Sequence, residues 1–408
     1  MPQTAGYPDV SEHAADSMSV TPSPECGHRS RHIHFLLDYS RAATFNPPLY
    51  QAGRPLELQV CKSYSPNLPS RVTATISNVL SMTMSVVLDV TFQTRHGPPV
   101  HHVLKLYDSR FGSCLREVDG DRVAPHTQEN EAAFEAFVRR GMMPGFLRHR
   151  HERNDPEESV LPVRAREFLD EPNRTEGLAK YEAALWQDCS EHFECETKAY
   201  HRLVKLQGTV VPRLYAHVSL LSATKLATIM PPEAAPYFEV RGILLERIDG
   251  YCLDNLTLGP LPKNLRTWQH IIQLAADAAY EINKHGIIME DCAPRNVVVD
   301  GKSQTPRIVD LAQCMFRDEM VSEWYKSGWH EDEDWDPELE YWEQVSTTCN
   351  PGAIAAVMAN RIYRKTGAKL EFRYPDWSGI FAKIRRRREE SAARARKTPS
   401  STTRAQKP

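Results

Sequence analysis

Long apolar runs and paired cysteine motifs are both missing from this 408-residue chain. No apolar run approaches the roughly 20 residues that a membrane-spanning helix needs. Residues 1–26 are polar and lack the charged-then-apolar order of a signal peptide. The nine cysteines are an odd number without any C-x-x-C pair, which fits neither a disulfide framework nor the usual zinc spacings. We therefore expect an intracellular protein, cytoplasmic or nuclear, with reduced thiols and no membrane partner.

An excess of charge of one sign is also missing from the chain as a whole, because 50 Lys and Arg face 53 Asp and Glu. Charged residues are 25% and hydrophobic residues 41% of the chain, as in ordinary globular proteins, so the chain should fold. The exception is segment 383–408, whose ten basic and two acidic side chains give it +8 and leave −11 for the rest. We expect a basic, disordered tail there. Nucleic acid is not an expected partner except through this tail.

The rest of the chain divides into an arm and a folded region. Residues 1–48 are expected to form a disordered N-terminal arm, because the first 31 are rich in Ser, Thr, Pro and His without hydrophobic periodicity. A long polar segment at about 108–185, with a mobile middle at 149–172, indicates an insertion. Periodicity predicts strands at 72–80, 86–92, 100–107, 211–218 and 242–248, helices around 134–138, 178–185, 188–206 and 268–284, and a hairpin over 297–310.

The clearest chemical arrangement follows the helix that stops at Gly286. Asp291 and Asn296 lie five positions apart just before the predicted hairpin, and Asp310 stands at the end of that hairpin. Magnesium prefers hard oxygen ligands, and one hairpin can bring together the amide of Asn296 and the carboxylate of Asp310.

This order of residues resembles the catalytic loop H-R-D-x-x-x-x-N and the metal-binding turn D-F-G of the protein-kinase-like family. The run Pro294-Arg295-Asn296 and the large insertion are most similar to kinase-like proteins of fungi. The resemblance implies an α+β, two-lobed fold with ATP and Mg²⁺ as ligands. Residues 49–248 would form an N-lobe with an antiparallel sheet and a helix, and residues 249–382 a short, mostly helical C-lobe.

The resemblance also implies a role for each site residue. The set is Asp291 as the base, Asn296 and Asp310 as Mg²⁺ ligands, Lys105 as the clamp on the ATP phosphates, Glu196 as the partner of that lysine, and Glu246 and Ile248 as the strand and hinge whose backbone holds adenine. Glu194 competes with Glu196 for the lysine, because both lie in the same predicted helix.

Two departures from the family pattern leave the activity open. Residues 78–86 contain no glycine, although glycine lets backbone N–H groups approach phosphates closely. Ser81 and Thr83 would have to contact the nucleotide there. Ala293 stands at the position of the family's loop lysine, and Arg295 is the nearest cation that could replace it.

Two interpretations follow from the retained and the missing residues. The retained acids and amide favour a phosphotransferase that moves the γ-phosphoryl group of ATP to a hydroxyl. The missing glycines and lysine favour the alternative, a pseudokinase that acts as a nucleotide-binding or scaffold module without turnover. No motif distinguishes a protein acceptor from a small-molecule acceptor.

Overall fold

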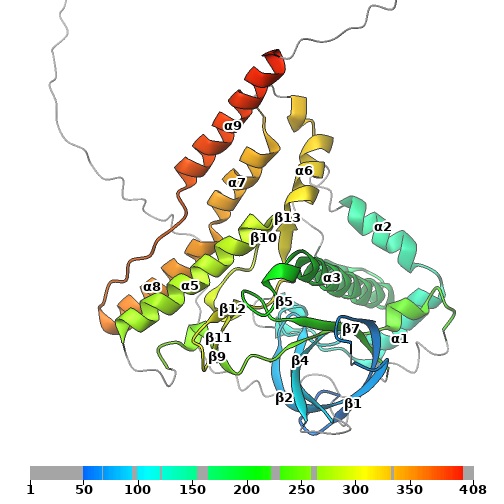
Figure 1. Cartoon of the computed structure of the whole chain (residues 1–408). Helices are drawn as coiled ribbons and strands as arrows, with labels where there is room; N and C mark the ends of the chain where they lie inside the picture. The colour runs from blue at the N-terminus through cyan, green and yellow to red at the C-terminus, as the bar shows by residue number, and fades with distance from the viewer. Residues whose placement is uncertain are drawn as a thin grey trace, which may run out of the picture. The chain divides into compact units, whose positions relative to one another are not determined.

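The computed structural model describes residues 49–66, 68–93, 99–119, 122–153, 164–221, 230–258, 264–331 and 335–397. The predicted N-terminal arm, 1–48, lies outside the described residues. The fold is mixed α+β, with antiparallel strands in the N-terminal part and mostly helices after residue 316 (Figure 1). In the part of the chain that is described, no helix is both long and apolar enough to cross a membrane.

Six strands of the N-terminal part form a closed antiparallel barrel in the order β1-β2-β3-β4-β8-β7. The strands are β1 (Pro55–Ser63), β2 (Arg71–Met82), β3 (Val86–Phe92), β4 (Val100–Tyr107), β7 (Leu214–Leu220) and β8 (Arg241–Glu246). The predicted meander of β2, β3 and β4 is confirmed. Strand β1 was not predicted, and it closes the barrel because it pairs with both β2 and β7. Leu58, Leu88 and Leu104 are buried in the barrel core.

The insertion after β4 is a small helical unit with its own core. Its elements are β5 (Glu117–Asp119), β6 (Arg122–Val123), α1 (Gln128–Arg139), α2 (Met143–Arg153) and η2 (Ala165–Asp170). Phe137 and Met143 pack there against Tyr181 and Leu185 of the following helix. Of the segment predicted to be mobile, residues 154–163 lie outside the described part, and its two ends are helical.

The two helices predicted at 178–185 and 188–206 are one helix, α3 (Arg174–Arg202), so the predicted break is wrong. The residues between them, Trp186 and Gln187, include no Pro or Gly that would stop a helix. The helix ends at Arg202, and a short 3₁₀ turn, η3 (Val204–Leu206), leads to Gly208 at φ +81°. One continuous helix therefore carries both the core of the insertion and Glu196.

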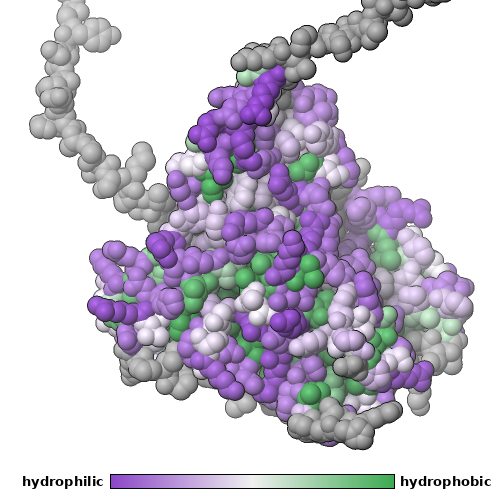
Figure 2. All heavy atoms as spheres, viewed as in Figure 1, coloured by the Kyte–Doolittle hydropathy of each residue, from purple (hydrophilic) through white to green (hydrophobic). Residues whose placement is uncertain are grey.

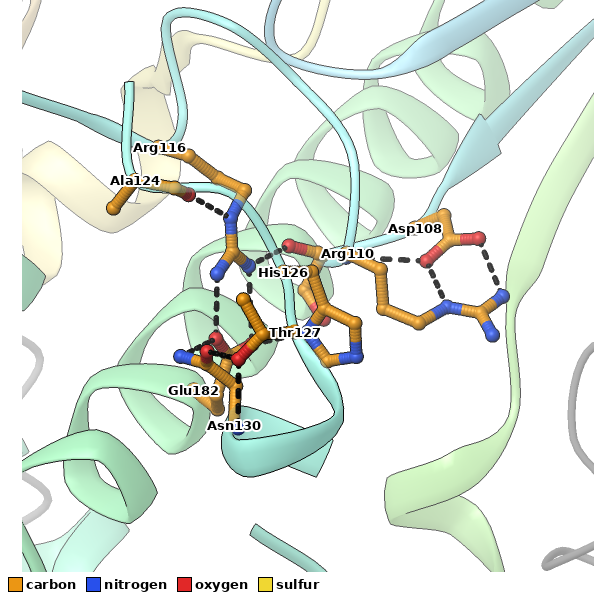
Figure 3. A network of polar contacts seen from close by, with 9 residues as sticks. Asp108, Arg110, Arg116, Ala124, His126, Thr127, Asn130 and Glu182 are labelled. Carbon is orange, nitrogen blue, oxygen red and sulfur yellow. Dashed lines mark hydrogen bonds and ion pairs between the residues drawn. The ribbon is translucent and has the colours of Figure 1, made fainter. Parts of the chain in front are cut away.

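A buried polar network fixes the insertion to α3 (Figure 3). The Arg116 guanidinium donates to both carboxylate oxygens of Glu182, at 2.5 and 3.0 Å. Asn130 Nδ2 donates to the same carboxylate at 2.8 Å, and His126 Nδ1 lies 3.3 Å from it. Any movement that separated Arg116 from Glu182 would leave a buried charge without a partner, which is costly. The network therefore holds the start of α1 and the loop after β4 in one position relative to α3.

The chain after β8 supplies two small sheets and helix α5. The elements are β9 (Gly250–Cys252), η5 (Leu253–Asn255), α5 (Leu265–Lys284), β10 (Ile287–Met289), η6 (Pro294–Asn296), β11 (Val297–Asp300), β12 (Pro306–Ile308) and β13 (Cys314–Phe316). Strand β11 pairs with β12, as the predicted hairpin requires, and also with β9. Ile271, Ala275 and Ile282 bury one face of α5 in the main core, and Gly286 ends it at φ +77°.

Helices α6 (Arg317–Lys326), α7 (Pro337–Thr348), α8 (Asn350–Thr366) and α9 (Trp377–Lys397) complete the described chain. The disorder predicted from residue 383 is wrong for 383–397, which belong to α9, and 398–408 lie outside the described residues. Ile384 is only 4% exposed, and Arg387 bonds to Glu338 of α7 at 2.8 Å. On the face seen in Figure 2, mostly hydrophilic side chains cover the end where α9 lies.

Candidate active site

Lys105 contacts two carboxylates from distant parts of the chain. Its Nζ lies 2.6 Å from Glu196 Oε2 and 2.6 Å from Asp310 Oδ1, and its side chain is 6% exposed. Strand β4 holds the backbone of this lysine, because Lys105 is paired with Val87 on one side and Ile243 on the other. Burial lowers the pKa of Lys105, but the charges and hydrogen bonds of the two carboxylates outweigh burial and raise the pKa above its usual value. The lysine is therefore a fixed cation.

Glu196 is fully buried and makes three polar contacts. Oε2 accepts hydrogen bonds from Lys105 Nζ and from the Tyr107 hydroxyl, and Oε1 accepts one from the Leu311 amide at 3.2 Å. The competing residue, Glu194, is 66% exposed and lies 3.5 Å from Arg241. The structure thus brings Glu196 to Lys105 and leaves Glu194 at the surface.

Asp310 occupies a backbone conformation that L-residues rarely adopt, at φ +63°. The preceding residue, Val309, donates its amide to the Asn296 carbonyl at 2.9 Å, so Asp310 is next in the chain to a residue bonded to the turn that contains Asn296. Burial raises the pKa of Asp310, but Lys105 and the Ala312 amide lower it below its usual value. Its side chain is 41% exposed. A strained, ionised and accessible carboxylate of this kind is typical of functional sites.

Asp291 and Asn296 lie together in the turn before β11. Asn296 Nδ2 donates to the Asp291 carbonyl at 2.8 Å and to Asp291 Oδ2 at 3.0 Å. The other carboxylate oxygen, Oδ1, forms an ion pair with Arg295. Arg295 is therefore not directed at a phosphate in this structure. The Asn296 amide donates through its nitrogen, which leaves its oxygen as the atom for a metal.

The turn between β2 and β3 is held by the insertion. Ser113 N donates to the Met82 carbonyl at 2.9 Å, and Cys114 N donates to the Thr83 carbonyl at 3.1 Å. A Cβ on Gly112, at φ +115°, would lie only 2.7 Å from that Thr83 oxygen, so glycine is required at this approach. The turn between β2 and β3 is therefore held by backbone hydrogen bonds, whereas a glycine-rich turn would be free to move.

Ser81 and Thr83 are both at this turn, with their hydroxyl oxygens 3.3 Å apart. Ser81 is paired with Val87, which is paired with Lys105, so Ser81 lies two strands from the lysine. At the usual strand spacing this separation is about 10 Å. The hydroxyls can contact a phosphate chain that extends from Lys105 toward the turn.

The predicted adenine-binding residues lie at the end of β8. The Glu246 carboxylate accepts from Arg307 Nη1 at 2.7 Å and from Arg213 N at 3.0 Å. Its own amide donates to the Arg213 carbonyl at 2.9 Å. Glu246 is thus committed to structural contacts through its side chain and its N–H. Ile248 follows in the connection to β9 and is half-buried.

Tyr107 and Leu311 belong to the site but were not predicted. Tyr107 follows Lys105 by two positions, and the period of a strand places both on one face, so a signal for it was present. Burial raises the pKa of Tyr107 well above its usual value, and the negative charge of Glu196, which accepts a hydrogen bond from the Tyr107 hydroxyl, raises it further. Leu311 contributes only its backbone N–H. Any residue can supply an amide, so its identity gives no signal.

The residues fit the ligand set of a magnesium ion that is shared with a phosphate. Asn296 and Asp310 offer an amide oxygen and a carboxylate, which are hard ligands of the kind that Mg²⁺ prefers. Among the described residues, no group of three or more His, Cys, Asp and Glu is arranged to hold a metal by itself.

Comparisons with known proteins add little to these contacts. No protein-family model matches the chain, and no curated protein matches it. Crystal structures of the PknI kinase domain from Mycobacterium tuberculosis match at 12% and 13% identity, with TM-scores of 0.28 and 0.26. The matches cover 59% of this chain and 59% and 58% of those chains. Values this low carry no argument, so the assignment of the site depends on its own contacts.

Proposed function

We propose that the chain is an ATP–Mg-dependent phosphotransferase of the protein-kinase-like fold that transfers the γ-phosphoryl group to a hydroxyl acceptor. The observation that carries the proposal is the contact of Lys105 Nζ with both Glu196 and Asp310, each at 2.6 Å. Three residues from β4, α3 and the segment after β12 meet at one buried amine. Structural ion pairs seldom need a strained and accessible member, and Asp310 is both. The similarity of this site to the fungal members of the family remains part of the proposal.

Each residue has a defined task in this scheme. Glu196 holds the amine of Lys105 so that its charge faces the α- and β-phosphates. Asn296 Oδ1 and Asp310 would hold Mg²⁺, which would neutralise phosphate charge. Asp291 accepts the proton of the acceptor hydroxyl on a carboxylate oxygen. The ion pair with Arg295 does not block this step, because the Arg295 side chain is 61% exposed and the pair is weak.

The alternative is a pseudokinase, a nucleotide-binding or scaffold module without turnover. The specific observation in its favour is that both carboxylate oxygens of Asp291 are engaged, Oδ1 by Arg295 and Oδ2 by Asn296. Each of these donors occupies a lone pair that an acceptor hydroxyl would otherwise use. The phosphotransferase and the pseudokinase would share the nucleotide site, and they would differ in whether Asp291 accepts a proton from an acceptor hydroxyl.

Thermal unfolding with and without ligand tests the nucleotide site. A ligand at a hundredfold excess over Kd stabilises the native state by about 2.7 kcal/mol, so ATP with Mg²⁺ should raise Tm by several degrees. Asp310→Ala should lose the Mg²⁺-dependent part of this shift, whereas Asp318→Ala, at the exposed start of α6, should keep it. If ATP with Mg²⁺ shifts neither the wild-type protein nor Asp318→Ala, the nucleotide site does not exist.

A further inference from the structure

Cys195 and Cys314 meet directly beside the site. Cys195 precedes Glu196 on α3, and Cys314 begins β13. Cys195 Sγ accepts from the Cys314 amide at 3.3 Å and donates to the Cys314 carbonyl at 3.5 Å. These two backbone atoms flank the Cα of Cys314. The Cys195 sulfur therefore lies against the backbone of the residue that carries the second thiol, which makes the two cysteines direct neighbours.

The two thiols differ in their readiness to react. A hydrogen bond with the Cys314 side chain, opposed by burial, holds the pKa of the Cys195 thiol below its usual value. The pKa of Cys314 is raised well above its usual value, first by its bond to Cys195 and then by burial. Both cysteines are partly exposed, in contrast to the buried Cys189. A partly exposed thiol of lowered pKa beside a second thiol is the arrangement of a peroxide-sensitive pair.

We propose that Cys195 and Cys314 are an oxidation site that closes into a disulfide when a peroxide is the oxidant. The Cys195 sulfur attacks the O–O bond of hydrogen peroxide, becomes a sulfenic acid and releases one water. The Cys314 sulfur then attacks the Cys195 sulfur, forms the S–S bond and displaces the second water. Two thiols and one peroxide thus become one disulfide and two waters.

The bond would join the elements that carry the site residues. Cys195 and Cys314 are 119 positions apart, and Cys314 is paired with Met289 of β10, two residues before Asp291. The disulfide would therefore link α3, which carries Glu196, to strands β10 and β13. Strand β10 leads into the turn that contains Asp291 and Asn296. This regulatory consequence rests on the proposed function. The disulfide would fix the arrangement in which Lys105 contacts Glu196 and Asp310. Oxidation should therefore lower the Kd for ATP–Mg severalfold.

Peptide mapping tests the disulfide without any nucleotide. The full-length reduced protein is treated with stoichiometric hydrogen peroxide, blocked with N-ethylmaleimide and digested without reductant. We expect a linked Cys195–Cys314 peptide in the monomer, and a Tm several degrees higher that dithiothreitol reverses. Cys61→Ser, an exposed cysteine on β1, should form the same link, whereas Cys195→Ser and Cys314→Ser should not. A native protein that gives no such link, or links other pairs instead, would overturn the proposal.

Binding measurements then separate this inference from the proposed function. The Kd for ATP–Mg is compared between reduced and oxidised wild-type protein, with Cys195→Ser exposed to the same peroxide as the control. A severalfold lower Kd only in oxidised wild-type supports the regulatory role, and an unchanged or higher Kd refutes that role. If even the reduced protein binds no ATP–Mg, the proposed function fails, while the peptide map still decides the oxidation site.

Discussion

Glu196 accepts a hydrogen bond from the amide of Leu311, 115 positions further along the chain, at 3.2 Å. The same carboxylate holds Lys105 through its other oxygen. Glu196 therefore sets the position of the lysine and the position of the backbone that follows Asp310. A change at this one side chain should affect both halves of the site.

Glu196→Gln should destabilise the protein and weaken nucleotide binding together. The amide keeps the size of the side chain but leaves the buried Lys105 with Asp310 as its only carboxylate, and breaking a buried ion pair costs about 3 kcal/mol or more. Urea unfolding measures the stability, and the ATP–Mg-induced rise in Tm measures binding. Glu194→Gln, two residues away on α3 and 66% exposed, is the matched control and should change neither. Equal stability of the two variants would show that the Glu196 contacts are not needed.

Asp291→Asn separates enzyme from pseudokinase. The variant is nearly isosteric and removes the group that would accept the hydroxyl proton, so phosphotransfer or slow ATP hydrolysis should fall by roughly a hundred- to ten-thousand-fold. The ATP–Mg-induced rise in Tm should stay almost unchanged, because Asp291 holds neither nucleotide nor metal in the scheme. Glu290→Gln, the exposed neighbour, should keep full turnover. Identical residual turnover in wild-type and Asp291→Asn would assign the chain to the pseudokinase alternative.

The sequence carried the order of the site residues but only part of the fold. Lys105, Glu196, Asn296 and Asp310 could be predicted because each needs a particular side chain at a particular place on a strand, helix or hairpin. Backbone contributions such as the Leu311 amide carry no side-chain signal. Strand β1 was missed although its signal was present, because Leu56, Leu58 and Val60 alternate with the polar Glu57 and Gln59 in the period of a half-buried strand.

The two helix errors have local physical causes. The two helices predicted at 178–185 and 188–206 leave only Trp186 and Gln187 between them, and neither of these is a helix-breaking residue. For α9, the basic residues from 383 onward led to a prediction of disorder. The helix nevertheless has a short apolar stripe with a helical spacing of three and four residues, formed by Trp377, Ile380, Phe381 and Ile384. The prediction gave more weight to the basic composition of this segment than to the spacing of its apolar residues. The burial of Ile384 shows that the spacing predicts the structure better.

Glu182 should make the stability of the insertion depend on pH. Burial raises the pKa of Glu182, but Arg116 and His126 outweigh burial and lower it from 4.5 to about 2. The folded form therefore binds its proton more weakly than the unfolded form. The resulting stabilisation, about 3 kcal/mol, is complete above pH 4.5 and is lost as the pH falls toward 2. Urea unfolding between pH 7 and 3 measures this loss.

Glu182→Gln is the comparison for this pH dependence, since it has no proton to gain. Its stability at pH 7 should be lower, and its decline between pH 4.5 and 3 should be shallower than that of the wild-type protein by the amount that Glu182 contributes. Glu129→Gln, which removes an exposed carboxylate paired with Arg174 on the same two helices, should follow the wild-type curve. Parallel curves for wild-type and Glu182→Gln would contradict the assignment.

Truncation after Ala382 should destabilise the folded chain, because α9 packs through the residues that follow. Ile384 is 4% exposed, and burial of such a side chain contributes about 1.5–3 kcal/mol. The salt bridge from Arg387 to Glu338 is half-exposed and adds little. Tm and urea unfolding of the truncated protein measure the loss, which Ile384→Ala should reproduce in large part and Arg387→Ala should not. Truncation after Lys397 is the control and should leave Tm unchanged. If removal of residues 383–408 has no larger effect than removal of 398–408, the buried contact of Ile384 does not stabilise the protein.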